Sequence, residues 1–303
     1  MKTFFRGRRI TACPALPQST LRKLAVATGL ALCSGLLSAH ASLLVSEDFN
    51  YGAGELHGKS GGTGFSGAWS ANTSVTEILA GGLSYTRIDG YTHNGGADRL
   101  RLQGNSDTAA QRALASVFSG DTFYVGLLLN VTGTLDNNDF GAGWFNNMNG
   151  IGLGLKANQG GGATTYDVFA RAKLDGNNAA YYQNLTMGVT YLVVAQFSKT
   201  TSGAANPYTT ANLWVNPVYA SSGTPNGTII QSGTGLSSDL SSFGFRTANL
   251  DGGDTVYYDM LRIGTAWADV VPVPEPATFI AGALLLLPFG ASTIRFLRRQ
   301  RVV

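Results

Sequence analysis

Short runs of alternating apolar and polar residues, separated by Gly, Ser, Thr and Asn, constrain the fold of this chain most strongly. Residues 165–173 show the pattern best, with Tyr166, Val168, Ala170 and Ala172 alternating with Asp167, Phe169, Arg171 and Lys173. Because successive side chains of a strand point to opposite faces, the first set predicts a packed face and the second a wetter one. Nine such runs are predicted strands: 84–88, 99–102, 122–131, 150–156, 165–173, 191–199, 211–218, 242–246 and 255–264.

Helical periodicity is weak in the same region. Only the alanine-rich residues 108–116 are expected to form one or two helical turns. About nine strands with turn residues between them favour two packed antiparallel sheets, and no fixed-period repeat suggests a solenoid. Residues 42–271 are therefore predicted to form one β-sandwich domain.

The N-terminus has the pattern of a secretory signal peptide over residues 1–41. An uncharged stretch, 24–37, follows a basic region that contains Arg6, Arg8, Arg9, Arg22 and Lys23. Ala39 and Ala41 then form a small-residue cleavage site, which predicts cutting before Ser42 by signal peptidase. The protein is expected to be exported.

The C-terminus, residues 272–303, has three parts in order. Pro274, Glu275 and Pro276 come first, and residues 277–294 follow without a charge. At 1.5 Å per residue these eighteen residues would form a helix of roughly 27 Å, which predicts one transmembrane helix. The basic tail 295–303 should stay in the cytoplasm, and its arginines are Arg295, Arg298, Arg299 and Arg301.

This order of Pro-Glu-Pro, apolar segment and arginine cluster resembles the PEP-CTERM sorting signal. The resemblance implies recognition by an exosortase, a membrane-embedded protease that cuts near the motif and releases or transfers the protein. An ordinary membrane anchor is the alternative, since it needs the apolar helix and the basic stop but no Pro-Glu-Pro.

Charge and cysteine content exclude several classes of protein. Without the ten basic residues of the two ends, 11 Lys and Arg face 18 Asp and Glu, a net charge of −7. Such an acidic chain repels phosphate backbones, so we expect no nucleic-acid partner and favour neutral partners or partners reached through bridging cations. Both cysteines, Cys13 and Cys33, precede Ser42, which excludes disulfides and cysteine nucleophiles from the exported part.

The ends of the exported domain show a second resemblance. Glu47, Asp48 and Phe49, followed by the glycine-rich residues 61–69 and closed by residues 258–264, are similar to concanavalin A-like (LamG-like) domains. The resemblance implies an all-β fold, an antiparallel two-sheet jelly-roll sandwich. With the C-terminal segment, the predicted fold class is this sandwich plus one transmembrane helix.

Catalytic patterns are missing from the sequence. Glycosidases of this fold need paired carboxylates on one strand face, as in E-x-D-x-x-E, and Glu47, Glu55 and Glu77 do not supply them. His57 and His93 lie in glycine-rich surroundings that favour loops, and there is no G-x-S-x-G elbow. A non-enzymatic surface or matrix protein is therefore the leading hypothesis. A polysaccharide hydrolase or lyase of the same fold is the alternative.

Two ligand sites are expected from local composition. Asp136 and Asp139, and separately Asp251 and Asp254, form oxygen-rich clusters that would suit calcium, although such residues also form ordinary turns. For polysaccharide, the best local set of an aromatic platform and amides is Trp144, Phe145, Asn146 and Asn147. Tyr181, Tyr182 and Gln183 come next. No other cofactor is expected.

Overall fold

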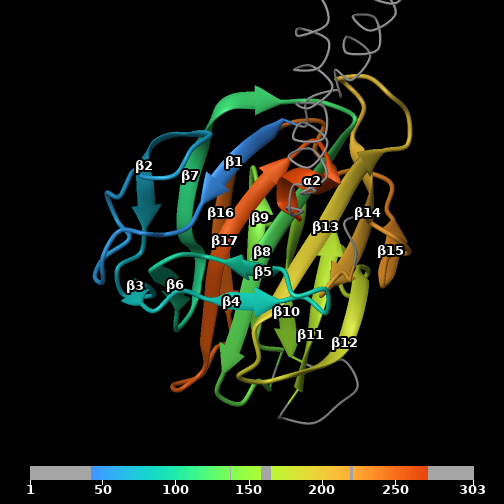
Figure 1. Ribbon diagram of the computed structural model, residues 1–303. Coiled ribbons are helices and arrows are strands. Elements are labelled where there is room, and N and C mark those ends of the chain that lie inside the picture. The colour runs from blue at the N-terminus through green and yellow to red at the C-terminus, as the bar shows by residue number, and fades with distance from the viewer. Residues whose placement is uncertain (1–41, 137, 158–164, 219–220, 272–303) are drawn as a thin grey trace, which may run out of the picture. The chain divides into compact units, whose positions relative to one another are not determined.

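Two antiparallel sheets, packed face to face, contain most of the chain that the structure describes (Figure 1). The computed structural model describes residues 42–136, 138–157, 165–218 and 221–271. Every strand pairing within these ranges is antiparallel. The described residues therefore form an all-β two-sheet sandwich.

Strands that are distant in sequence lie next to each other in both sheets. The eight-stranded sheet has the order β15 (Gly227–Ile230), β14 (Tyr208–Val215), β13 (Tyr191–Lys199), β8 (Thr122–Thr132), β17 (Thr255–Gly264), β6 (Asp98–Leu102) and β3 (Thr76–Ala80), with β1 (Leu43–Glu47) also paired to β17. The seven-stranded sheet has the order β12 (Ala180–Thr186), β11 (Thr165–Arg171), β10 (Gly152–Ala157), β9 (Phe140–Phe145), β16 (Leu240–Ala248), β7 (Ser106–Phe118) and β2 (Phe65–Ala71).

The main core lies between the sheets. Alternation sends Leu153 of β10 and Val168 of β11 into it, and both are completely buried. Phe123 of β8 meets Phe145 of β9 there in an edge-to-face contact, with ring centres 5.2 Å apart. Burying a side chain of this size stabilises a fold by about 1.5–3 kcal/mol. Side chains that point the other way from β9, β10 and β11 lie on the outer face of the seven-stranded sheet.

A second apolar cluster packs on the outer face of the eight-stranded sheet. A small hairpin of β4 (Ser84–Thr86) and β5 (Thr92–Asn94) lies across this sheet in Figure 1, and the short helix α2 (Trp267–Val270) follows β17. Leu83 beside the hairpin and Trp267 of α2 join Leu128 and Trp214 of the sheet in this cluster. Apolar side chains thus cover this outer face.

All nine predicted strands overlap observed strands, and 191–199 and 255–264 have the predicted bounds. The expected helical turns at 108–116 are wrong, because these residues belong to β7. This stretch pairs with β16 on one side and β2 on the other. The two sets of cross-strand partners outweigh the helix propensity of alanine, since propensity is a small term beside tertiary packing.

The predicted fold class also needs correction. Among the residues that the structure describes, no helix is long and apolar enough to cross a membrane. The only helix there is the four-residue α2, so the fold class is an all-β two-sheet sandwich. The segment predicted to span, 277–294, lies outside the described residues. So do Ala39, Ala41, the Pro274–Glu275–Pro276 motif and the four C-terminal arginines, whereas Ser42 is described.

Candidate functional site

An open groove of about 240 Å³ lies on the outer face of the seven-stranded sheet. Its floor and walls come from five neighbouring strands and from residues at their ends: Asn138, Phe140, Lys156, Phe169, Arg171, Leu174, Gly176, Ala179, Tyr181, Arg246, Ala248 and Asn249. Three cations and three aromatic rings therefore meet in one place. We call this feature the basic groove.

Strand register explains why these side chains meet. Lys156 of β10 stands opposite Phe140 of β9, and Phe169 of β11 stands opposite Tyr181 of β12. Gly154 of β10 stands between Ala142 of β9 and Phe169 of β11 and contributes no side chain there. The rings of Phe140 and Phe169 stack with centres 5.3 Å apart across this strand. The aromatic floor thus depends on a residue without a side chain.

Arg171 is the most unusual residue of the groove. Its side chain is nearly buried, with 5% of the residue exposed, and its guanidinium carbon lies 5.5 Å and 5.2 Å from the ring centres of Phe140 and Phe169. The Nη2 group donates a 3.4 Å hydrogen bond to Met148 O, whereas the buried Nε has no partner. Burial, together with nearby Arg246, lowers the pKa of Arg171 to about 10, so it stays charged at neutral pH.

This buried charge has no carboxylate partner among the described residues, whose ion pairs do not include Arg171. A buried charge without a counter-charge is costly, because the interior does not replace the solvation that water supplied. The two aromatic rings offset part of this cost through cation–π attraction. An anionic group entering the groove would supply the missing partner.

The other two cations are partly engaged. Lys156 Nζ donates to Asn177 Oδ1 at 2.5 Å, and burial followed by the charge of Arg171 lowers its pKa. Arg246 Nε donates to Asp107 Oδ1 at 2.8 Å, and its guanidinium lies 5.5 Å from the Phe140 ring centre. Both remain on the wall of the groove, where a ligand can reach them.

The predicted sugar platform does not form one surface. Trp144 is only 3% exposed and Phe145 is fully buried, so neither ring offers a free face to a sugar. As adjacent strand residues they point to opposite faces, Phe145 into the core and Trp144 to the outer face above Gly244. Asn146 holds a loop by donating to Asp239 O at 2.7 Å, and Asn147 is exposed.

The predicted calcium ligands come closer together than their sequence positions suggest. Burial, with the charges of Asp254, Asp136 and Asp251, raises the pKa of Asp139 to about 6. Two of the four carboxylates bind loop backbones: Asp139 accepts from Asp136 N at 2.6 Å, and Asp254 accepts from Asp251 N at 3.1 Å and from Thr134 N at 2.8 Å. In the described part of the chain, no group of three His, Cys, Asp or Glu side chains is arranged to hold a metal.

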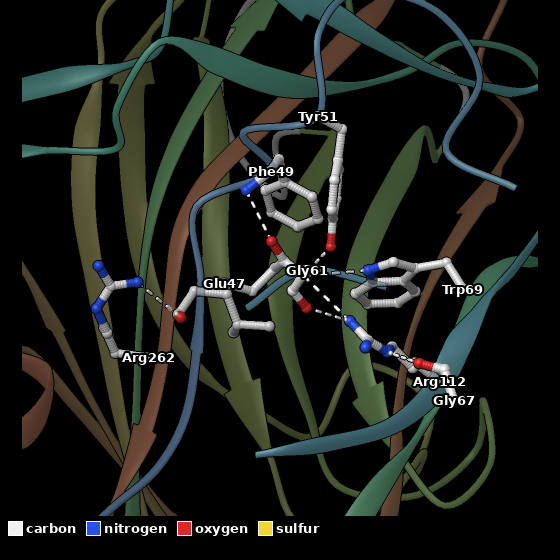
Figure 2. A network of polar contacts seen from close by, with 9 residues as sticks. Glu47, Phe49, Tyr51, Gly61, Gly67, Trp69, Arg112 and Arg262 are labelled. Carbon is white, nitrogen blue, oxygen red and sulfur yellow. Dashed lines mark hydrogen bonds and ion pairs between the residues drawn. The ribbon is translucent and has the colours of Figure 1, made fainter. Parts of the chain in front are cut away.

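The most extensive carboxylate network lies elsewhere, around buried Glu47 (Figure 2). Its Oε1 accepts from Phe49 N at 2.8 Å. Its Oε2 accepts from Tyr51 OH at 2.5 Å and Trp69 Nε1 at 3.2 Å, and Arg112 Nη1 lies 3.4 Å away. Burial and the bond to Glu47 raise the pKa of Tyr51.

Arg112 completes this network by donating to Gly61 O at 2.7 Å and Gly67 O at 2.9 Å. It thereby ties the end of β1 and the glycine-rich loop to β7. Unlike Arg171, Glu47 has donors on both oxygens, so little hydrogen-bonding capacity is left for a ligand. We assign the network a structural role.

Sequence reasoning missed Phe140, Lys156 and Arg246 as site residues. The signal that could have found the groove was the second face of 165–173, which carries Phe169 and Arg171. The prediction that this face is the wetter one is wrong, because Asp167, Phe169 and Arg171 are all buried. The assignment of Tyr166 and Val168 to the packed face is confirmed. Tyr181, from the second-choice aromatic set, does line the groove.

Comparison with known proteins adds only distant likenesses. No protein-family model matches the sequence, and no curated protein matches it. Among solved structures, the chain is similar to an alginate lyase, with 16% identity over 74% of this chain and 97% of that chain and a TM-score of 0.41. It is also similar to the botulinum neurotoxin serotype G binding domain, with 10% identity over 76% of this chain and 50% of that chain and a TM-score of 0.45.

A glycosyl hydrolase family protein from Mycobacterium fortuitum is a third likeness, with 11% identity over 73% of this chain and 99% of that chain and a TM-score of 0.35. At these identities and TM-scores the three likenesses carry no argument about the activity of this chain. The functional conclusion depends on the groove itself.

Proposed function

We propose that this chain is an exported cell-surface or extracellular-matrix protein whose sandwich binds polysaccharide without cleaving it. One observation carries the binding part of the proposal: the basic groove places a nearly buried guanidinium, whose Nε has no hydrogen-bond partner, against two stacked aromatic rings in an open channel. Aromatic faces bind the apolar faces of sugar rings, and fixed polar groups orient the hydroxyl and acidic groups.

The extent of the groove favours a chain over a single small molecule. It crosses β12, β11, β10, β9 and β16, which are consecutive neighbours in the sheet. Four intervals of about 4.8 Å between strands give a length of roughly 19 Å. A polymer of several sugar units fills such a channel better than one sugar does.

The lining favours binding over hydrolysis. Glycoside hydrolysis needs two carboxyl groups on either side of the scissile bond, and the lining residues include no Asp, Glu or His. Lys156 and Tyr181 could act as bases only in an elimination reaction, which is the lyase alternative. Incubation of the purified protein with polysaccharides tests this directly, because unsaturated or shortened products would contradict a purely binding role.

Binding is tested by titrating the protein with a panel of soluble polysaccharides and repeating the titration with Tyr181→Ala. The variant should bind the preferred polysaccharide at least about tenfold more weakly, as expected for loss of one aromatic contact. Tyr182→Ala is the matched control, because Tyr182 is the neighbouring ring and does not line the groove. Equal losses in both variants, or no binding by the wild type, would contradict the proposal.

Export and sorting are proposed from the sequence patterns at the two ends. The A-x-A site before Ser42 supports removal of a signal peptide, and Pro274, Glu275 and Pro276 support processing by an exosortase-type protease. Mass spectrometry of the protein recovered from the cell surface should find an N-terminus at Ser42 and no peptide that reaches Arg295. Recovery of peptides reaching Arg295, in a host that possesses an exosortase, would contradict the sorting proposal.

A further inference from the structure

We infer that the basic groove selects acidic polysaccharides, with the carboxylate of a uronic acid unit bound by Arg171. The inference rests on the proposed function and specifies its ligand class. It begins from the buried Nε of Arg171, which has no hydrogen-bond partner, and from the absence of an ion pair to this residue in the described part of the chain. A planar guanidinium binds a carboxylate through two parallel hydrogen bonds, which a neutral hydroxyl cannot reproduce.

The positions of the cations fit a chain that carries more than one carboxylate. Arg246 lies on β16, Lys156 two strands away on β10, and Arg171 on the next strand, β11. The guanidinium carbons of Arg171 and Arg246 each lie 5.5 Å from the Phe140 ring centre, so these two groups are at most about 11 Å apart, and Lys156 stands opposite Phe140 on the next strand. A polymer lying across the strands can therefore place successive acidic units against different cations.

The aromatic floor distinguishes a sugar acid from other anions. Phe140 and Phe169 stack beneath the groove, and the Tyr181 ring centre lies 6.4 Å from that of Phe169. The partly exposed rings of Phe140 and Tyr181 are the ones that can contact the carbon-bearing face of a pyranose, and Phe169, only 2% exposed, stacks against Phe140. A phosphate or sulfate group gains nothing from such rings.

Polygalacturonate and its fully methyl-esterified form are the decisive probes, because they share one backbone and differ in the charge of the carboxylate. The purified wild-type protein should bind polygalacturonate at least about tenfold more tightly than the ester, as expected for one charge-assisted interaction. Added salt should weaken the first interaction and leave the second nearly unchanged. Dextran sulfate should bind more weakly than polygalacturonate, and equal binding would show that the groove reads charge alone and would overturn the inference.

Arg171→Gln should remove the preference for the acid over the ester. Arg101→Gln is the control for net charge, because Arg101 lies on β6 of the other sheet and pairs with Glu77. Arg171→Lys keeps the charge without the planar fork and should fall between wild type and Arg171→Gln. Circular dichroism and melting curves identify any variant that does not fold. Lys156→Gln is a second test at a more exposed position, and it should also reduce the preference for the acid over the ester.

Two failures can be told apart. If acid and ester bind equally and Tyr181→Ala weakens both, the groove is a neutral-glycan site, which overturns this inference and leaves the proposed function intact. If neither polymer nor any other glycan binds, the proposed function itself is wrong.

Discussion

Replacing Glu47 by Gln should destabilise the sandwich strongly, because it removes the carboxylate that pairs with buried Arg112. Both side chains are almost inaccessible, with exposed fractions of 1% for Glu47 and 3% for Arg112. Glutamine has nearly the same shape but presents one oxygen and one NH₂ group. Whichever way the amide is turned, an N–H faces either Phe49 N or the donors of Tyr51, Trp69 and Arg112.

The magnitude follows from what is left unpaired. Breaking a buried ion pair by removing one partner costs about 3–5 kcal/mol, because the remaining charge stays desolvated. For a domain of this size, 1 kcal/mol lowers the melting temperature by about 2–4 °C. We therefore expect Glu47→Gln to lower the melting temperature by about 6–20 °C.

Glu77→Gln is the matched control. Glu77 pairs with Arg101 at 2.5 Å, but their side chains are 39% and 33% exposed, so the same substitution should cost about 0–1 kcal/mol. Calorimetry and urea unfolding of both variants measure the difference, and an unchanged m-value would show that both fold to the same compactness. If Glu47→Gln costs no more than Glu77→Gln, the reasoning that the network of Figure 2 anchors the N-terminal loop is wrong.

Four further predictions follow from other parts of the sandwich. Burial, aided by Arg87, lowers the pKa of His93 to about 4, so stability should decrease as pH falls from about 6.5 towards 4, and His93→Phe should flatten this part of a urea-unfolding pH profile. Burial raises the pKa of Asp259 to about 7, so the stability of wild type relative to Asp259→Asn should be greater at pH 5 than at pH 8. If a variant and the wild type show parallel pH profiles of stability, the pKa shift assigned to that residue, His93 or Asp259, is wrong. Gly64→Ala should destabilise by at least about 1–3 kcal/mol more than Gly104→Ala, because both glycines have a φ near +80° but only at Gly64 would a Cβ clash, 1.7 Å from a backbone oxygen. Chelators should shift the melting temperature little, since Asp139 and Asp254, two of the four aspartates predicted for calcium, accept from loop backbone N–H groups in the structure; a calcium-dependent rise of many degrees would show a metal site.

The groove corrects an expectation drawn from net charge. Without the basic residues of its two ends the chain carries −7, which favoured neutral partners, yet Lys156, Arg171 and Arg246 meet on one sheet face. A total charge sums over the whole chain, whereas a ligand responds to the charges within a few ångströms, because water and salt screen the rest. The amino-acid composition therefore could not predict that the basic groove carries positive charge.

Local pattern also misled the choice of aromatic residues. Trp144 and Phe145 stand beside three asparagines, which suggested an exposed sugar platform. In the fold, Phe145 enters the core and Trp144 packs over Gly244, a residue of a strand far along the chain. Sequence neighbours of an aromatic residue do not reveal which cross-strand partner covers it.

What the sequence determines by itself is local. The period of two in residues 165–173 assigns Val168 to the packed face and Arg171 to the opposite one, because strand geometry forces alternation whatever lies around it. The glycine-rich residues 61–69 are a second local feature. Gly64 has a φ of +82°, which residues other than glycine rarely adopt, so the sequence supplies the residue type that this turn requires.

Only the tertiary structure decided the function we propose. Antiparallel pairing of strands distant in sequence brings Arg246 of β16 and Phe140 of β9 to the same face as Arg171 of β11. Register then left the Nε group of Arg171 without a hydrogen-bond partner in the groove and gave Glu47 donors on both oxygens in the network of Figure 2. Whether a polar group is free for a ligand depends on which distant strands pack against it, and local sequence does not contain that information.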